Sequence, residues 1–259
     1  MSWTTAGQMI AADILKLRRH RPTMVTAALL SVGSAILFFA YIAFHHPGGF
    51  AGSRAISDGA TLMGIYFGAF AAILVGAEAG AIDLASGVFR DLVATGRSRT
   101  ALFLVRVPAA TVISLTLTLA GFAVTVAAGA AFHGSAPAPS PGLALKYAAW
   151  VAVATIVQAA LATGIASLTG SRSVTLVAVI GLNTIATTIL TLATFLGPAR
   201  DLILLLALGQ LSPGQQVSPG VHPKSGSVTM PTVVAVLVVL AWAVIPAIAG
   251  AWRTRTQDA

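Results

Sequence analysis

Six long apolar stretches occupy about half of the chain and constrain its fold more than any other feature. Each has 18 to 26 residues, which matches the roughly 20 residues that an α-helix needs to cross about 30 Å of hydrocarbon. Membrane-spanning β-strands would instead alternate apolar and polar residues. We therefore expect an all-α polytopic membrane protein. The predicted spans are residues 24–44, 60–77, 107–132, 147–169, 174–196 and 231–252.

The composition indicates that this membrane domain is the whole fold. The chain is 57% hydrophobic and 8% charged, whereas soluble domains carry charge on about a quarter of their residues. The longest segment outside the predicted spans, residues 197–230, is shorter than the roughly 40 residues that a chain needs to fold alone. We therefore expect residues 1–259 to form a single transmembrane domain. Cysteine is absent, which excludes disulfides but reports no compartment.

The formal net charge of +8 raises the question of nucleic-acid binding, and the positions of the cations argue against it. With the amino terminus inside, eleven Lys and Arg residues lie in cytoplasmic segments and four lie outside. This positive-inside pattern predicts that both termini are cytoplasmic and that no nucleic acid is a partner. An excess of arginine over lysine indicates a GC-rich bacterial genome, hence the bacterial inner membrane. The inner cations are Lys16, Arg18, Arg19, Arg21, Arg90, Arg97, Arg99, Arg106, Arg172, Arg253 and Arg255; the outer ones are Arg54, Lys146, Arg200 and Lys224.

Two shorter apolar segments flank this core of spans. Residues 199–211 are too short for a seventh crossing, which would also move Arg253 and Arg255 outside, so we expect a short interfacial or re-entrant helix on the outer face. Residues 1–23 carry an apolar stripe at helical spacing and a cationic end. They predict an amphipathic elbow helix with its apolar side at the lipid headgroups, or else a basic flank that only sets orientation. The stripe is Trp3, Ala6, Ile10, Ile14 and Leu17, and the cations are Lys16, Arg18, Arg19 and Arg21.

The cytoplasmic connection between the second and third spans, residues 78–108, carries the most information about function. Apolar residues at helical spacing, with polar ones turned elsewhere, predict a short amphipathic helix over residues 84–95 that Gly96 ends. Such a helix suits a docking element for a cytosolic partner, although an interfacial helix that merely turns the chain has the same pattern. The apolar set is Leu84, Val88, Leu92 and Val93, and the polar set is Ser86, Arg90 and Asp91.

The order of residues in this connection resembles the membrane subunits of type-two ABC transporters. The matching positions are Asp83, Gly87, Arg90, Leu92, Val93, Ser98 and Arg99, while Asp83, Val88 and Gly96 replace a glutamate, a threonine and a proline. The elbow, six spans and outer helix follow the same layout. The resemblance implies that residues 84–95 are a coupling helix on an ATPase subunit. The residues implied in that contact are Asp83, Leu84, Gly87, Val88, Arg90, Asp91, Leu92, Ser98 and Arg99.

The same resemblance implies partners, because the chain contains no GxxxxGK[ST] phosphate-binding loop. ATP and Mg²⁺ would be bound by the partner ATPase, and this chain would be a transport subunit rather than an enzyme, with no cofactor of its own. Two ATPase copies and a second permease are implied, with a homodimer expected and a heterodimer left open. The implied activity is export of a drug-like, antibiotic or lipid-like amphiphile.

Polar and aromatic residues within the spans give candidates for a substrate pathway. They are Tyr66 and Phe70 on the second span and Asn183, Thr184, Thr187, Thr188 and Thr191 on the fifth. Hydrogen bonding between helices or to carbonyls of the same helix is the alternative, and we favour it for Thr111, Ser114, Thr118 and Thr125 on the third span. Glu78 is predicted to be a snorkelling or paired structural carboxylate, with Arg106 or Arg90 as its partner, and a gating contact is the alternative. Gly64 with Gly68 and Gly76 with Gly80 predict close helix approach.

Other classes of membrane protein fit less well. All five histidines lie in loops or at span ends, and no paired carboxylates or metal-ligand cluster occurs in a span, so an intramembrane enzyme is disfavoured. A secondary transporter usually carries carboxylates or broken helices at mid-membrane. That class and a non-transporting membrane scaffold remain the alternatives.

Overall fold

The computed structural model describes residues 3–45, 52–88, 93, 94, 96, 98–135, 137–192, 194–214 and 230–256. All regular structure in these residues is helical. Six stretches are long and apolar enough to cross a membrane: Arg21–His45, Gly52–Ala85, Arg99–Ala131, Pro141–Thr169, Arg172–Ile189 and Thr232–Thr256. Each coincides with one predicted span, so the all-α fold with six spans is confirmed. The architecture is consistent with a multi-pass membrane protein.

One helix, α1 (Trp3–Arg19), precedes the spans. The first span comprises α2 (Arg21–Ala28), a π-helical turn (Leu29–Gly33) and α3 (Ser34–His45). The second comprises α4 (Gly52–Thr61), a π turn (Leu62–Tyr66) and α5 (Phe67–Ala85). The third and fourth are α7 (Arg99–Ala131) and α8 (Pro141–Thr169). The fifth comprises α9 (Arg172–Gly181), a π turn (Leu182–Ala186) and α10 (Thr187–Leu192), and the sixth is α12 (Thr232–Thr256).

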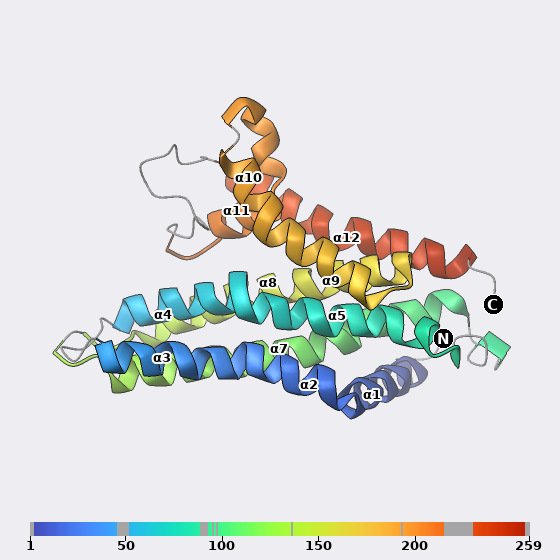
Figure 1. Ribbon diagram of the computed structural model, residues 1–259, viewed down its shortest axis with the longest axis horizontal. Coiled ribbons are helices and arrows are strands. Elements are labelled where there is room, and N and C mark those ends of the chain that lie inside the picture. Colours follow the sequence, from blue (N-terminus) through green and yellow to red (C-terminus); the bar gives the residue numbers. More distant parts are fainter. Residues whose placement is uncertain are drawn as a thin grey trace.

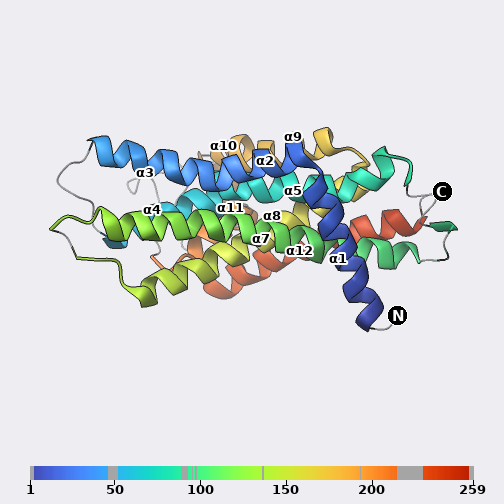
Figure 2. The same cartoon turned by 90° about the horizontal axis from the view of Figure 1, so that it is seen from below.

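The spans lie side by side around α5. Helices α2 to α5, α7 and α8 run along the long axis of the molecule, and α9, α10 and α12 lie on one side of them (Figure 1). Helix α1 instead crosses the ends of its neighbours at a steep angle (Figure 2). Every residue of α5 from 71 to 81 is buried, so α5 is the centre of the bundle.

Glycines set the closest helix contacts. A Cβ atom at Gly76 would lie 2.6 Å from the carbonyl oxygen of Ala159, and one at Gly80 would lie 2.6 Å from that of Thr163. The backbones of α5 and α8 therefore touch, as the Gly76 and Gly80 pair predicted. Gly164 makes the corresponding contact between α8 and α12, since its Cβ would lie 2.4 Å from the Pro246 oxygen.

The short helix between the fifth and sixth spans packs against the rest of the bundle. A 3-10 segment (Thr194–Leu202) leads into α11 (Leu204–Gln210), where residues 199–211 predicted one helix. Leu204 and Leu208 are buried in the main apolar core. The indole nitrogen of Trp150 donates to the Leu208 oxygen at 2.8 Å, and that of Trp242 donates to the Leu202 oxygen at 2.9 Å. Helix α11 is therefore held against the bundle by apolar packing and by two indole hydrogen bonds, while its depth in the membrane stays a prediction.

Several predicted boundaries differ from the ends of the helices: two helices continue beyond the apolar residues, and the α-helix of the fifth span ends early. The coupling helix predicted to begin at Leu84 does not begin there: Leu84 and Ala85 continue α5, and Gly87, with φ 73°, follows its end. Helix α7 begins at Arg99 rather than 107, because flanking polar residues also form helix. The fifth span ends its α-helix at Leu192 rather than 196.

The apolar stripe of α1 also differs from its prediction. Leu17 is buried, and Ile10 and Ile14 pack with it against the cluster formed by α5 and α7. These three side chains therefore contact the protein, and the position of α1 at the lipid headgroups stays a prediction. The favoured interpretation of the third-span hydroxyls, hydrogen bonding, holds for Thr125, which donates to the Phe122 backbone oxygen at 2.7 Å. It was wrong for Ser114 and Thr118, whose buried hydroxyls have no hydrogen-bond partner among the described residues.

Candidate functional site

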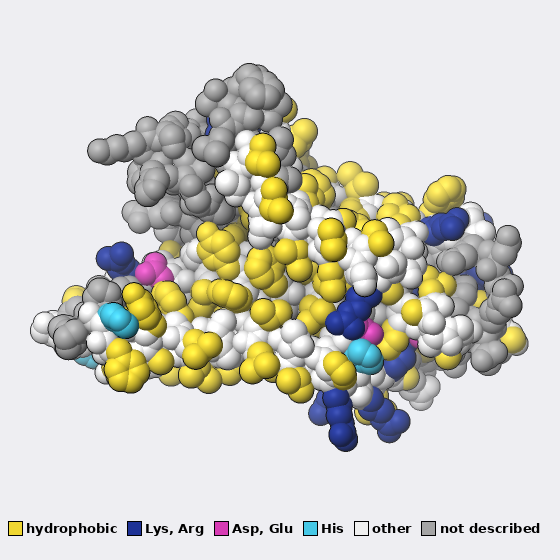
Figure 3. Space-filling view, in the orientation of Figure 1, with side chains coloured by type: hydrophobic (Ala, Val, Ile, Leu, Met, Phe, Trp, Pro, Cys, Tyr) yellow, Lys and Arg dark blue, Asp and Glu magenta, His cyan; other side chains and the backbone are white. Residues whose placement is uncertain are grey.

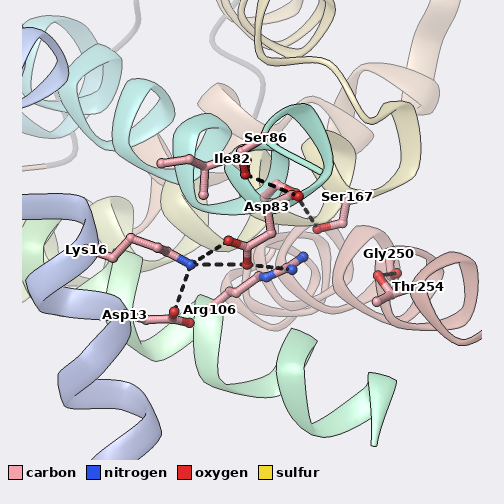
Figure 4. A network of polar contacts seen from close by, with 10 residues as sticks. Asp13, Lys16, Ile82, Asp83, Ser86, Arg106, Ser167, Gly250 and Thr254 are labelled. Atoms are coloured by element: carbon pink, nitrogen blue, oxygen red, sulfur yellow. Dashed lines mark hydrogen bonds and ion pairs between the residues drawn. The ribbon is translucent and has the colours of Figure 1, made fainter. Parts of the chain in front are cut away.

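The last turns of α5 carry two carboxylates, Glu78 and Asp83, that are buried and paired with cations from other helices. Their residues are 5% and 4% exposed. Glu78 was recognisable from the sequence as a charge at the end of a span. Asp83 was assigned only to the connection between the second and third spans. The two carboxylates and their cationic partners are together called the charged cluster, and Figure 4 shows the part of it around Asp83.

Asp83 joins three helices. Its Oδ1 and Oδ2 accept from the Lys16 ammonium of α1 at 2.9 and 3.1 Å, and Oδ2 also accepts from Nη2 of Arg106 of α7 at 2.8 Å. Lys16 lies 2.9 Å from Asp13 as well. Two carboxylates thus face two cations, and the buried charges balance. Arg106 is only 1% exposed, so this pair has almost no access to water.

Glu78 joins a second set of helices. Its Oε2 accepts from the Thr23 hydroxyl of α2 at 2.9 Å and lies 2.7 Å from Nη1 of Arg172 of α9. The Nδ1 atom of His20, between α1 and α2, lies 2.7 Å from the Thr23 oxygen and 3.7 Å from Glu78. Because the only hydroxyl hydrogen of Thr23 points at Glu78, Nδ1 of His20 must be the donor to Thr23.

Local sequence places the two arginines. The Ser98 side chain accepts from the Ala101 amide and starts α7, so that Arg106 projects from the third turn of the helix. Gly170, with φ 66°, ends α8, and the Ser171 side chain accepts from the Val174 amide and starts α9. This tight turn sets Arg172 at the first position of α9, where it reaches Glu78.

Of the two partners predicted for Glu78, Arg106 was wrong. Arg106 binds Asp83, and the cation on Glu78 is Arg172. Sequence reasoning could not find this pair, because it depends on how α9 packs against α5. Arg90, the other predicted partner, lies outside the described residues.

The residues implied in the ATPase contact fall in three places. Asp83 is in the buried cluster, and Leu84 is half-buried on α5 beside it. Gly87 and Val88 are exposed after the end of α5, and Ser98 and Arg99 start α7. Arg90, Asp91 and Leu92 lie outside the described residues. The contact itself stays a prediction.

The candidate pathway residues of the fifth span form mostly local bonds. The Asn183 amide donates to the Gln158 side chain of α8 at 3.0 Å, and both residues are buried. The hydroxyls of Thr184, Thr187 and Thr188 instead donate to backbone oxygens of their own helix. The side chain of Thr191 lies outside the description. Gln158 was missed, although a single glutamine in an apolar span is a recognisable signal.

The aromatic candidates lie at the π turn of the second span. Tyr66 ends this turn and is 38% exposed, and Phe70 packs at the edge of the main core. Gly68 accommodates the turn, since a Cβ there would lie 2.3 Å from the Met63 carbonyl oxygen.

The cluster is suited to a mechanical role. Removing one partner from a fully buried ion pair costs about 3–5 kcal/mol, so Asp83 and Arg106 hold the end of α5 firmly against α7. The side chains of Lys16 and Arg172 are 32% and 37% exposed, so their pairs hold α1 and α9 less firmly. Within the described residues, no three His, Asp or Glu side chains meet to hold a metal ion. No protein-family model matches the chain, and no curated protein matches it.

Proposed function

We propose that this chain is the membrane-spanning permease subunit of an ATP-driven ABC exporter whose ATP is hydrolysed by a separate subunit. The observation that supports the proposal is the pairing of Glu78 and Asp83 with cations of α1, α7 and α9. These contacts join three helices to α5 immediately before residues 84–95, the segment that the resemblance implies docks on the ATPase. A displacement of that segment would therefore be shared by most of the bundle.

Helix lengths support the same role. The α4–α5 stretch has 34 residues and α7 has 33, or about 50 Å each at 1.5 Å per residue. A hydrocarbon layer of about 30 Å cannot contain them. The predicted spans are residues 60–77 and 107–132. Residues 78–85 and 99–106 therefore extend past the hydrocarbon, on the side of the connection between the second and third spans. The ion pairs lie in this extension, where they stiffen it.

In the proposed assembly two copies of this chain bind two ATPase subunits in a bacterial inner membrane, with both termini cytoplasmic. Closure of the ATPase subunits on ATP moves the connection between the second and third spans, and the ion pairs of Glu78 and Asp83 transmit this movement to the spans. Tyr66 on the second span, which is 38% exposed, is the candidate to meet a drug-like, antibiotic or lipid-like amphiphile.

A second candidate function is secondary transport. The π turns at Leu29–Gly33, Leu62–Tyr66 and Leu182–Ala186 interrupt three of the six spans. Such turns often occur at functional sites, and interrupted helices form the binding sites of secondary transporters. The two candidates differ in their energy source.

Coexpression with an ABC ATPase subunit encoded beside this chain tests the proposal. The charge reversal Arg90→Glu with Asp91→Arg should release the ATPase from membranes. The Asp83→Asn variant should retain the ATPase and lose ATP-driven efflux of an amphiphilic dye from inverted vesicles. The control is the reversal Arg54→Glu with Asp58→Arg, because this pair lies exposed on α4 at the other end of the second span.

Two results would count against the exporter. Retention of the ATPase after the double reversal at Arg90 and Asp91 removes the coupling assignment. Dye efflux that follows a proton or sodium gradient without the ATPase establishes the secondary transporter instead.

A further inference from the structure

Three arginines form an exposed cationic surface where α1 meets α2. Arg18 and Arg19 end α1, Arg21 starts α2, and all three are exposed. The nearby carboxylates Asp13, Asp83 and Glu78 pair with Lys16, Arg106, His20 and Arg172. In the part of the chain that the structure describes, no carboxylate pairs with these three arginines. Lys and Arg side chains project together from the molecule over α1 and α2 (Figure 3).

The backbone separates these arginines from the cations of the buried cluster. Lys16 and Leu17 face inward, to Asp83 and to the apolar core, while the next two residues face outward. His20 interrupts the helix with ψ 76°, and the chain turns there from α1 into the first span. The arginines thus lie at the start of a span and carry uncompensated charge.

An exposed apolar strip continues from this surface along the first span. Arg21, Val25 and Leu29 are four residues apart, so they share one face of the helix. Val25 is 57% exposed and Leu29 is 65% exposed. Charge at the membrane boundary that continues into an apolar strip matches the shape of a phospholipid, with an anionic headgroup and an acyl chain. Free phosphate or an acidic protein surface would contact the arginines but not the apolar strip.

We propose that Arg18, Arg19 and Arg21 bind the headgroup of an anionic phospholipid whose acyl chain lies along Val25 and Leu29. This site depends on the membrane position of the first span and not on the transport function. Each arginine near an anionic membrane surface contributes about a fivefold increase in affinity, the equivalent of about 1 kcal/mol. The three together should favour an anionic over a zwitterionic lipid about 100-fold.

The test uses the purified full chain in detergent micelles. Native mass spectrometry measures bound phosphatidylglycerol against phosphatidylcholine with the same acyl chains. The triple variant Arg18→Gln, Arg19→Gln and Arg21→Gln should lose about 100-fold of the selectivity, and the double variant Arg18→Gln, Arg19→Gln about 25-fold. Inorganic phosphate should not displace the lipid. Because all three side chains are exposed, the variants should keep the melting temperature of the native chain.

The matched control is Arg253→Gln with Arg255→Gln, which removes two exposed arginines from the end of α12. Its selectivity should stay within twofold of the native chain. An equal loss in both double variants would show a general charge effect and overturn the site. Displacement by inorganic phosphate would show a free-anion site. If the triple variant kept the native selectivity, the proposal would also be overturned. An acidic protein would then be the remaining candidate partner of the arginines.

Discussion

Replacing Asp83 by asparagine should destabilise the protein more than replacing either of its cations. The substitution preserves the shape of the side chain and removes the charge that Lys16 and Arg106 share. Arg106 is 1% exposed and cannot turn to water. Losing one partner of a buried ion pair costs about 3–5 kcal/mol. At about 2–4 °C per kcal/mol for a chain of this size, the melting temperature should fall by about 10 °C.

Replacing either cation should destabilise the protein less than Asp83→Asn, because Asp83 then keeps one cationic partner. After Arg106→Met, the Lys16 ammonium still lies 2.9 and 3.1 Å from the carboxylate oxygens, so the cost should be about 1–2 kcal/mol. After Lys16→Met the buried Arg106 contact remains. The Lys16 side chain is 32% exposed, so its loss should cost about 1 kcal/mol or less. The expected order of destabilisation is Asp83→Asn, then Arg106→Met, then Lys16→Met.

Melting of the purified variants in one detergent, followed as loss of the monomer peak in size-exclusion chromatography, measures this order. The double variant Asp83→Asn with Arg106→Met removes both buried charges and should be more stable than Asp83→Asn alone. A double variant whose losses simply add, or an Asp83→Asn protein that melts within about 1 °C of the native chain, would refute the pairing argument.

Three further predictions concern contacts inside the bundle, and the same melting assay measures each. Asn183→Ala should cost about 1 kcal/mol because it leaves the buried Gln158 Oε1 without its donor, and adding Gln158→Leu should restore most of the loss. Gly164→Ala should cost about 1–3 kcal/mol by overpacking α8 against α12, whereas Gly181→Ala, with no atom within 4 Å of its new Cβ, should be neutral or stabilising. Trp150→Phe should cost about 1 kcal/mol by removing the bond that holds α11.

The number and order of the spans could be predicted from the sequence because the bilayer imposes their length. A helix must satisfy its own backbone groups over about 20 apolar residues, and that pattern is local. The ends of the helices depend less on the local apolar pattern. Arg99 to Arg106 are too polar to count as a span, yet Ser98 caps them into the same helix as residues 107–131. The sequence therefore predicted the spans better than it predicted the helices.

The charge cluster could be predicted only in part. Glu78 was identifiable as a buried carboxylate because it follows an apolar run. Its partner Arg172 is 94 positions further along the chain, and only the packing of α9 on α5 brings them together. The same holds for Lys16 and Asp83, which are 67 residues apart. Spacing along one helix predicts neighbours three or four residues apart, and these pairs have no such relation.

Burial also changes what the positive-inside pattern means for this chain. Counting along the sequence gives equal weight to every cation on the predicted cytoplasmic side. The structure divides them: Lys16, Arg106 and Arg172 are matched by carboxylates, whereas Arg18, Arg19, Arg21, Arg253 and Arg255 are exposed. In the predicted orientation the paired cations add little net charge to the cytoplasmic face, so we expect the exposed arginines to carry the electrostatic preference for it. The prediction is therefore that orientation and helix joining depend on different members of the same sequence cluster, and residues 16–21 contain both kinds.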